Sequence, residues 1–149
     1  MNADYFISRL NLEKHPEGGF YRELYRQDAN LATSIYFLLR SGEVSKFHRL
    51  KSDEIWYFHA GTSLTVHIID AGGALKAVKL GADPEAGEQP QVIVPGGCIF
   101  GATVNREDSY TLVGCMVSPG FEFAGFELLS RDRLLKDYPQ HENIIMLLT

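Results

Sequence analysis

The sequence has few cysteines, and their scarcity limits the roles that cysteine can have. Cys98 and Cys115 are the two in a chain of 149 residues. They form neither a CxxC pair nor the several spaced cysteines of a disulfide framework. Each lies in an apolar, strand-like segment without a neighbouring His, Lys or Arg to lower the thiol pKa. We interpret both as small buried hydrophobic residues, with a redox role as the alternative.

Long apolar runs and basic clusters are also missing. The longest apolar runs, such as 144–148, are far shorter than the ~20 residues that span a membrane. Residues 1–12 mix polar with apolar side chains and lack the apolar core of a signal peptide. The 14 Lys and Arg residues are scattered along a chain of net charge −5, so no basic stripe exists for a nucleic acid. We therefore expect a cytoplasmic protein without membrane or nucleic-acid partners.

Short β-prone runs separated by turn residues make up most of the chain. The 14 Gly and 6 Pro residues stand between runs such as 33–40, 64–68 and 75–80, the last two of which predict an antiparallel hairpin. The polar segment 81–90 predicts a loop, and 144–148 predicts an apolar tail. About nine strands, with a short helix over 4–10 and another after Ser130, predict an all-β sandwich or small barrel. Its length fits one domain, 1–149.

The most informative stretch runs from Gly42 to Gly61. His48 and Glu54 lie between these glycines, on two short predicted strands joined by a polar turn. Because side chains alternate along a strand, two strands that fold back on each other bring both polar groups toward one interior. We expect any chemistry to occur there.

These residues resemble the first motif of the cupin superfamily, Gly-x5-His-x-His-x3,4-Glu-x6-Gly. Of the second motif, Gly-x5-Pro-x-Gly-x2-His-x3-Asn, only Pro95 and Gly97 are present. Gln89, Phe100 and Val104 replace its first glycine, its histidine and its asparagine. Four segments resemble the uncharacterised cupin type 5 family. They are His-Pro-Glu-Gly-Gly-Phe-Tyr-Arg-Glu, Ser-Lys-Phe-His-Arg-Leu-Lys-Ser-Asp-Glu-Ile-Trp, Cys-Met-Val-Ser-Pro-Gly-Phe-Glu-Phe and Tyr-Pro-Gln-His. This resemblance covers almost the whole chain. It implies a double-stranded β-helix jelly roll, with short terminal helices here, and a homodimer.

A more distant likeness is to the metal-free sugar-nucleotide 3,5-epimerases. The segment 19–23 is similar to their Arg-Gly-Phe-Phe-x-Glu sequence, and His48 is close to their catalytic base. Glu54 replaces their lysine and Phe100 their second-motif histidine, so the groups that handle charge and protons differ. The likeness implies that Tyr21 and Glu23 reach the pocket.

A metal site is one reading of His48 and Glu54, which are both ligand types. A catalytic metal usually has about three protein ligands. Leu50 and Phe100 occupy the remaining ligand positions, and His59 lies at the wrong strand parity to replace them. We therefore expect no metal cofactor, with metal at His48 and Glu54 as the disfavoured alternative.

A metal-free acid–base site is the second reading. His48 would abstract a proton next to a carbonyl group, and Glu54 would orient or charge its imidazole. The structural alternative is a buried, mutually hydrogen-bonded pair that remains from a metal-binding ancestor. The sequence leaves both open.

Aromatic residues near the motif are candidates for ligand contact. Trp56 shares the parity of the motif carboxylate, and Phe100 replaces a ligand histidine at the barrel mouth. Tyr36, on the preceding strand, is a weaker candidate for which core packing is favoured. Tyr21 and Glu23 have the same parity, so both should reach the pocket if one does.

These observations predict a cupin that binds a small polar, sugar-like molecule and uses His48 and Glu54 in isomerase or epimerase chemistry. A non-catalytic binding or regulatory cupin is the alternative from another class. A metal-dependent oxygenase or isomerase is a third.

Overall fold

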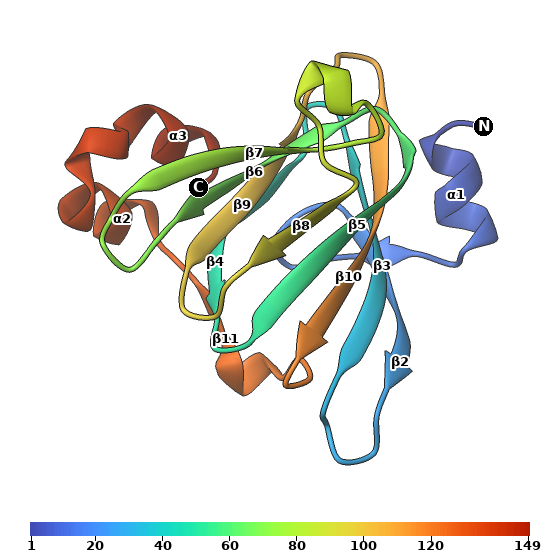
Figure 1. The fold of residues 1–149 in the computed structure, drawn as a ribbon, viewed down its shortest axis with the longest axis horizontal. Coiled ribbons are helices and arrows are strands. Elements are labelled where there is room, and N and C mark those ends of the chain that lie inside the picture. The colour runs from blue at the N-terminus through green and yellow to red at the C-terminus, as the bar shows by residue number, and fades with distance from the viewer.

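Two antiparallel sheets face each other in the computed structural model, which describes residues 1–149 (Figure 1). The first sheet has the order β1-β2-β3-β10-β5-β8. Its strands are β1 (Glu13–Lys14), β2 (Phe20–Arg26), β3 (Thr33–Arg40), β10 (Tyr110–Ser118), β5 (Asp53–Gly61) and β8 (Gln91–Val94). The second sheet has the order β11-β4-β9-β6-β7. Its strands are β11 (Phe126–Leu128), β4 (Val44–Leu50), β9 (Ile99–Val104), β6 (Leu64–Ile69) and β7 (Leu75–Leu80).

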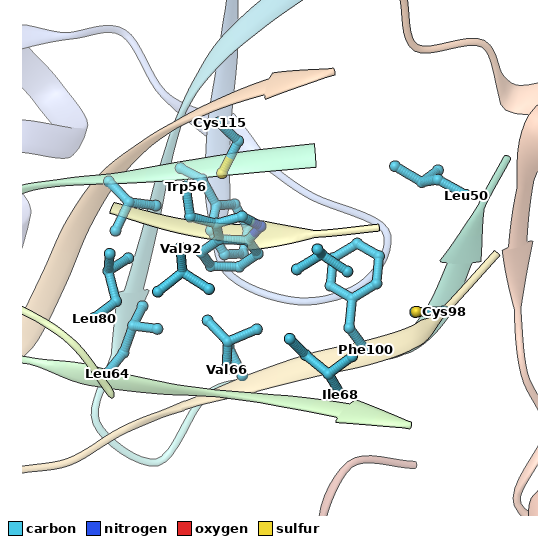
Figure 2. Packing of buried hydrophobic residues seen from close by; sticks show 14 of the residues in the cluster. Leu50, Trp56, Leu64, Val66, Ile68, Leu80, Val92, Cys98, Phe100 and Cys115 are labelled. Atoms are coloured by element: carbon cyan, nitrogen blue, oxygen red, sulfur yellow. The ribbon is translucent and has the colours of Figure 1, made fainter. Parts of the chain in front are cut away.

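The main hydrophobic core fills the space between the sheets (Figure 2). It contains 16 buried residues, with Trp56 of β5 and Phe100 of β9 among the largest. The two rings meet edge to face, with centroids 6.4 Å apart. Since they come from opposite sheets, this contact helps to hold the sheets together.

Short helices cover the outer face of each sheet. Helix α1 (Ala3–Arg9) covers Leu38 of β3, and its N-terminus is capped by the Asn2 side chain. On the second sheet, α2 (Arg131–Asp137) and α3 (Glu142–Leu147) bury apolar side chains against Phe47 of β4. None of the helices has the length and apolar character needed to cross a membrane.

Most of the predicted elements are confirmed, and two segments differ. The strand over 33–40 and the β6–β7 hairpin are present, as are the helices at both ends. The segment 81–90 is not irregular throughout, because Asp83 caps a 3-10 helix over Pro84–Ala86. The apolar tail 144–148 lies largely within α3, which begins after a further 3-10 helix, Pro139–His141. In this helical form the segment buries Ile145 and Leu148 against the second sheet.

The turn between β1 and β2 packs tightly against β4. Its backbone closes with a 2.9 Å hydrogen bond from His15 N to Gly19 O, and Lys46 N donates to Glu17 O at 2.9 Å. Gly18 has φ +113°, and a Cβ at this position would be 2.1 Å from Val44 O. Glycine is therefore required both by the backbone conformation and by the close approach of β4.

We predict that Gly18→Ala destabilises the protein more than Gly87→Ala does. Both glycines have positive φ, but a Cβ on Gly87 would meet nothing within 4 Å. The comparison isolates the clash with β4, which should lower the free energy of unfolding by about a further 1–3 kcal/mol. Urea unfolding measures both values, and equal losses would show that the turn moves away from β4 without cost.

Candidate functional site

A cavity of about 500 Å³ opens between the sheets beside the β1–β2 turn. Four buried polar side chains line it: Glu17 from the turn, Thr33 from β3, His48 from β4 and Glu54 from β5. Further toward solvent its wall carries exposed charged side chains, namely Glu13, Glu23, Arg26 and Glu122. Three aromatic rings from the segment after β10 also line the cavity, namely Phe121, Phe123 and Phe126.

His48 and Glu17 form a buried pair with a single proton between them. His48 Nε2 lies 3.0 Å from Glu17 Oε2, and His48 Nδ1 lies 2.7 Å from the carbonyl oxygen of Lys46. A backbone carbonyl can only accept, so we assign a hydrogen to Nδ1. The contact at Nε2 then needs one proton, on either the imidazole or the carboxyl group. Ser45 Oγ donates to the other oxygen, Glu17 Oε1, at 3.0 Å.

An irregularity in β4 makes this arrangement possible. The pairing of β4 with β9 shifts register between Ser45 and His48, where Lys46 and Phe47 together stand opposite the single residue Gly101 of β9, so β4 has one extra residue. Side chains three residues apart on a regular strand point to opposite faces. The shift turns both Ser45 and His48 toward Glu17, as bulges often re-aim side chains at functional sites.

Burial favours the neutral form of the pair. It raises the pKa of Glu17 to about 8, although the Ser45 hydrogen bond opposes the rise. It also lowers the pKa of His48 to about 4, against the effect of the Lys46 carbonyl. Desolvation penalises the charged form of each group, so the proton belongs to Glu17 at neutral pH.

His15 supports the pair from the side. Its Nδ1 accepts a 3.1 Å hydrogen bond from Glu17 N, which fixes the start of the turn. Burial, and then repulsion from His48, lowers the pKa of His15 to about 4. Its ring also packs on Tyr21, with centroids 4.5 Å apart.

Glu54 is a second buried carboxyl group on the cavity wall, 6% exposed. Burial and the charge of Glu17 raise its pKa to about 8, which the neighbouring Cys115 thiol and Trp56 indole oppose. No lysine or arginine forms an ion pair with it. Trp56 Nε1 is itself buried without a hydrogen-bond partner of good geometry.

The expected pairing of His48 with Glu54 differs from the contact in the structure, where Glu17 is the partner of His48. The reason is that β4 and β5 belong to different sheets, so His48 and Glu54 approach the cavity from opposite walls. Strand alternation does not reveal Glu17 as the partner of His48, because Glu17 lies in a turn and not on a strand. Its signal was the Gly18-Gly19 pair, which indicates a close backbone approach without naming the strand approached.

The predicted ligand-contact residues divide into two groups. Tyr21 and Glu23 of β2 both line the cavity, in agreement with their shared parity. Trp56 and Phe100 are buried in the hydrophobic core (Figure 2). They are not part of the cavity lining. Tyr36 lies on the outer face of the first sheet, where its ring meets His59 at 5.8 Å under α1, so it does not reach the cavity.

The donor set does not fit the metal site typical of cupins. No three His, Cys, Asp or Glu side chains are grouped so that they could hold an ion. Both nitrogens of His48 already have partners. Leu50 contributes an apolar side chain to the wall, and the Phe100 ring packs on His48 with centroids 4.1 Å apart.

Comparison with known proteins identifies the family. The model of the Cupin_5 family, a branch of the cupin superfamily also called DUF985, matches residues 4–129. The chain belongs to this family. The uncharacterized protein YML079W of Saccharomyces cerevisiae is 30% identical over 154 residues, which cover 87% of this chain and 76% of the yeast protein.

Solved structures of two similar proteins have the same fold over the whole chain. Protein SO0799 from Shewanella oneidensis is 55% identical, with a TM-score of 0.96 over 100% of this chain and 98% of that one. A hypothetical protein from Leishmania major is 38% identical, with a TM-score of 0.93 over 100% and 99% of the two chains. This cupin therefore has relatives in bacteria and eukaryotes.

A more distant structure shows the fold alone. Oxalate decarboxylase from Bacillus subtilis has a TM-score of 0.65 at 18% identity, over 91% of this chain and 36% of the decarboxylase. Together with the two facing antiparallel sheets, this likeness confirms the predicted cupin jelly roll.

The buried titratable groups predict how stability depends on pH. Between about pH 4.5 and 6.5, the folded chain holds one proton more at Glu54 and one fewer at His15 than the unfolded chain, so the effects cancel. From about pH 6.5 to 8, the folded chain keeps protons on Glu54 and on the Glu17–His48 pair that the unfolded chain has lost. The free energy of unfolding should therefore fall as pH rises through this window, by up to about 2 kcal/mol per group.

Urea unfolding at steps from pH 4.5 to 8 measures this change. Glu54→Gln should remove about half of the decrease above pH 6.5, because the Glu17–His48 pair remains. A free energy of unfolding that rises over that window would contradict the neutral state of the site.

Proposed function

We propose that this cupin binds a small polar, sugar-like molecule in its cavity and acts on it as a metal-independent isomerase or epimerase. The observation that carries the proposal is the Glu17–His48 pair, which holds one transferable proton on the cavity wall. Nearby aromatic rings and polar groups suit a sugar ring, which has an apolar face and hydroxyl edges.

Glu17 and Glu54 are the groups that would contact the reacting atoms. Ionisation of one keeps the other protonated, since the charge of Glu17 raises the pKa of Glu54. The cavity then contains one carboxylate base and one carboxylic acid, the combination that enolisation requires. The base removes hydrogen from the carbon next to a carbonyl group, the C–H electrons form a C=C bond, and the acid protonates the carbonyl oxygen. Return of the proton to a different carbon or face completes the isomerisation.

His48 would act through Glu17 and not on the ligand. Its Nδ1 is held by the Lys46 carbonyl, and its Nε2 faces the Glu17 carboxyl group. When the shared proton lies on Nε2, Glu17 is a carboxylate base. When the proton lies on Oε2, Glu17 is an acid. Either state leaves the net charge of the pair unchanged, which suits a buried site.

A cupin that binds its ligand without turnover is the alternative. Buried polar pairs also occur as purely structural features that satisfy hydrogen bonds in a core. Turnover distinguishes the two functions directly, because only the catalytic one exchanges carbon-bound hydrogen with solvent.

We predict that the protein incorporates deuterium next to the carbonyl carbon of a keto-sugar or aldo-sugar in D2O. NMR would be used to follow a panel of free and nucleotide-linked sugars. Glu17→Gln and His48→Ala should each reduce the exchange rate by about 10²-fold or more, because they remove the proton carrier or its partner. Glu85→Gln is the matched control, since Glu85 lies exposed in the 3-10 helix Pro84–Ala86.

An unchanged rate in Glu17→Gln would contradict the catalytic role of this residue. Binding of a sugar without exchange by the wild-type protein would favour the non-catalytic alternative.

We also predict that the site works without a bound metal. After expression in metal-supplemented medium and exhaustive dialysis, elemental mass spectrometry should find iron, manganese, nickel and zinc far below one ion per chain. The physical reason is the donor set, in which His48 is already engaged and Leu50 and Phe100 provide no ligand. A near-stoichiometric metal would redirect the search to metal-assisted chemistry.

A further inference from the structure

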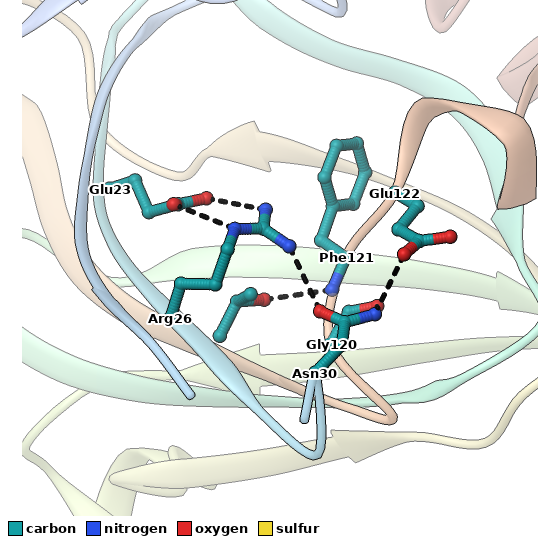
Figure 3. Close-up of polar contacts among 7 residues, drawn as sticks. Glu23, Arg26, Asn30, Gly120, Phe121 and Glu122 are labelled. Atoms are coloured by element: carbon teal, nitrogen blue, oxygen red, sulfur yellow. Dashed lines mark hydrogen bonds and ion pairs between the residues drawn. The ribbon is translucent and has the colours of Figure 1, made fainter. Parts of the chain in front are cut away.

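The cavity contains many carboxyl groups and no free cation. Its lining includes five glutamates, at positions 13, 17, 23, 54 and 122, but only one arginine and no lysine. Arg26 is already neutralised by a bidentate contact with Glu23, at 3.0 Å and 2.8 Å (Figure 3). Its remaining nitrogen, Nη1, donates to Asn30 at 2.9 Å. The cavity therefore offers no cation to pair with an anionic ligand.

The two histidines do not supply that charge either. Burial lowers the pKa values of His15 and His48 to about 4, so both rings are neutral at physiological pH. A phosphate or carboxylate that entered the cavity would lose its hydration without gaining an ion pair.

Glu54 is the feature that points to a ligand of opposite charge. Its carboxyl group is 94% buried (6% exposed) and lines the cavity, with no lysine or arginine beside it. The neighbouring groups are a thiol, Cys115, and an indole, Trp56, which are neutral donors and bring no positive charge. Such a carboxyl group lacks a cationic partner within the protein. A ligand that brings a cation into the cavity can form a charge-assisted hydrogen bond with it.

The aromatic part of the lining provides a second, independent indication. Phe121, Phe123 and Phe126 meet one another edge to face, with centroid separations of 5.1, 5.9 and 6.2 Å. All three line the cavity. The faces of aromatic rings attract ammonium groups, and several rings grouped together with carboxylates are typical of sites for organic cations.

We infer that the cavity takes a ligand with a protonated amino group, such as an amino sugar or another amine-bearing polyol, and discriminates against phosphorylated and carboxylate ligands. The inference rests on the proposed ligand-binding function and names the charge class of its ligand. The ammonium group lies against the phenylalanine cluster and Glu54, whose ionised form its charge favours, and the hydroxyl groups face the Glu17–His48 wall.

The test compares three probes that share one ring and differ in charge: glucosamine, glucose and glucose 6-phosphate. Tetramethylammonium serves as a minimal cation. Protein-observed NMR titrations at constant ionic strength measure each dissociation constant for the wild-type chain. Glucosamine should bind about tenfold or more tightly than glucose, and glucose 6-phosphate should bind more weakly than glucose. Tetramethylammonium should shift the resonances of Phe121, Phe123 and Phe126.

Two variants locate the charge preference. Glu54→Gln should reduce the ratio of glucosamine affinity to glucose affinity from about tenfold to about one. Phe121→Leu should weaken tetramethylammonium binding by about threefold or more, and it provides a measurement if Glu54→Gln does not fold. Glu85→Gln, outside the cavity, should change neither affinity.

Equal affinity for the three sugars, tighter binding of the phosphate, or an amine preference that survives Glu54→Gln would overturn the inference. Glucose binding in the cavity without a charge ranking would overturn the inference and leave the proposed function standing. Failure of all four probes to bind would overturn the inference, whereas the deuterium-exchange experiment decides the proposed function separately.

Discussion

The arrangement of the site depends on the bulge of β4, in which Lys46 and Phe47 stand opposite one residue of β9. All four of their backbone groups have partners, as a buried strand requires. Lys46 N donates to Glu17 O and Lys46 O holds His48 Nδ1, while Phe47 N donates to Leu148 O and Phe47 O accepts from Leu129 N. The same irregularity thus docks the β1–β2 turn, fixes the histidine tautomer and anchors the chain at both ends of the C-terminal helices. A regular β4 would break all of these contacts together.

Burial determines the chemistry of the titratable groups on the cavity wall. His48, Glu17 and Glu54 are each at least 94% buried, so charge on any of them is expensive unless it is shared or paired. Neutral acids and neutral imidazoles at physiological pH are the consequence. This neutrality gives carboxyl groups that donate protons near pH 8, far above their usual range. One such group lies on each side of the cavity: Glu17, in the β1–β2 turn beside β4, and Glu54, on β5.

The sequence predicted the fold better than the site, for physical reasons. Alternation and turn residues are local, so they were enough to predict the strands and the antiparallel architecture. The position of His48 and Glu54 on the cavity wall also follows from strand parity. The Glu17 contact could not be derived in this way, because it depends on a turn docking against a strand about thirty residues later and on a register shift that reverses parity. Core packing was favoured for Tyr36, and the structure packs its ring on the face of β3 that α1 covers. Alternation alone could not exclude the cavity, because it does not say which face of a strand covered on both sides lines it.

Charged and titratable groups lie both at the rim and in the depth of the cavity, and their surroundings differ. At the rim, Glu23 and Arg26 cancel each other, and Asn30 joins them to the segment after β10 through its bonds to Glu122 and Gly120. This network ties the β2–β3 hairpin to the chain that carries Phe121, whose N–H also bonds to Thr33 of β3. It therefore shapes the entrance, but solvent screens its charges within about one Debye length. Glu54 lies in a medium of lower dielectric constant, where a contact with a ligand cation would outweigh several charge contacts at the surface. For this reason the inferred preference for an amine is assigned to the depth of the cavity and not to its rim.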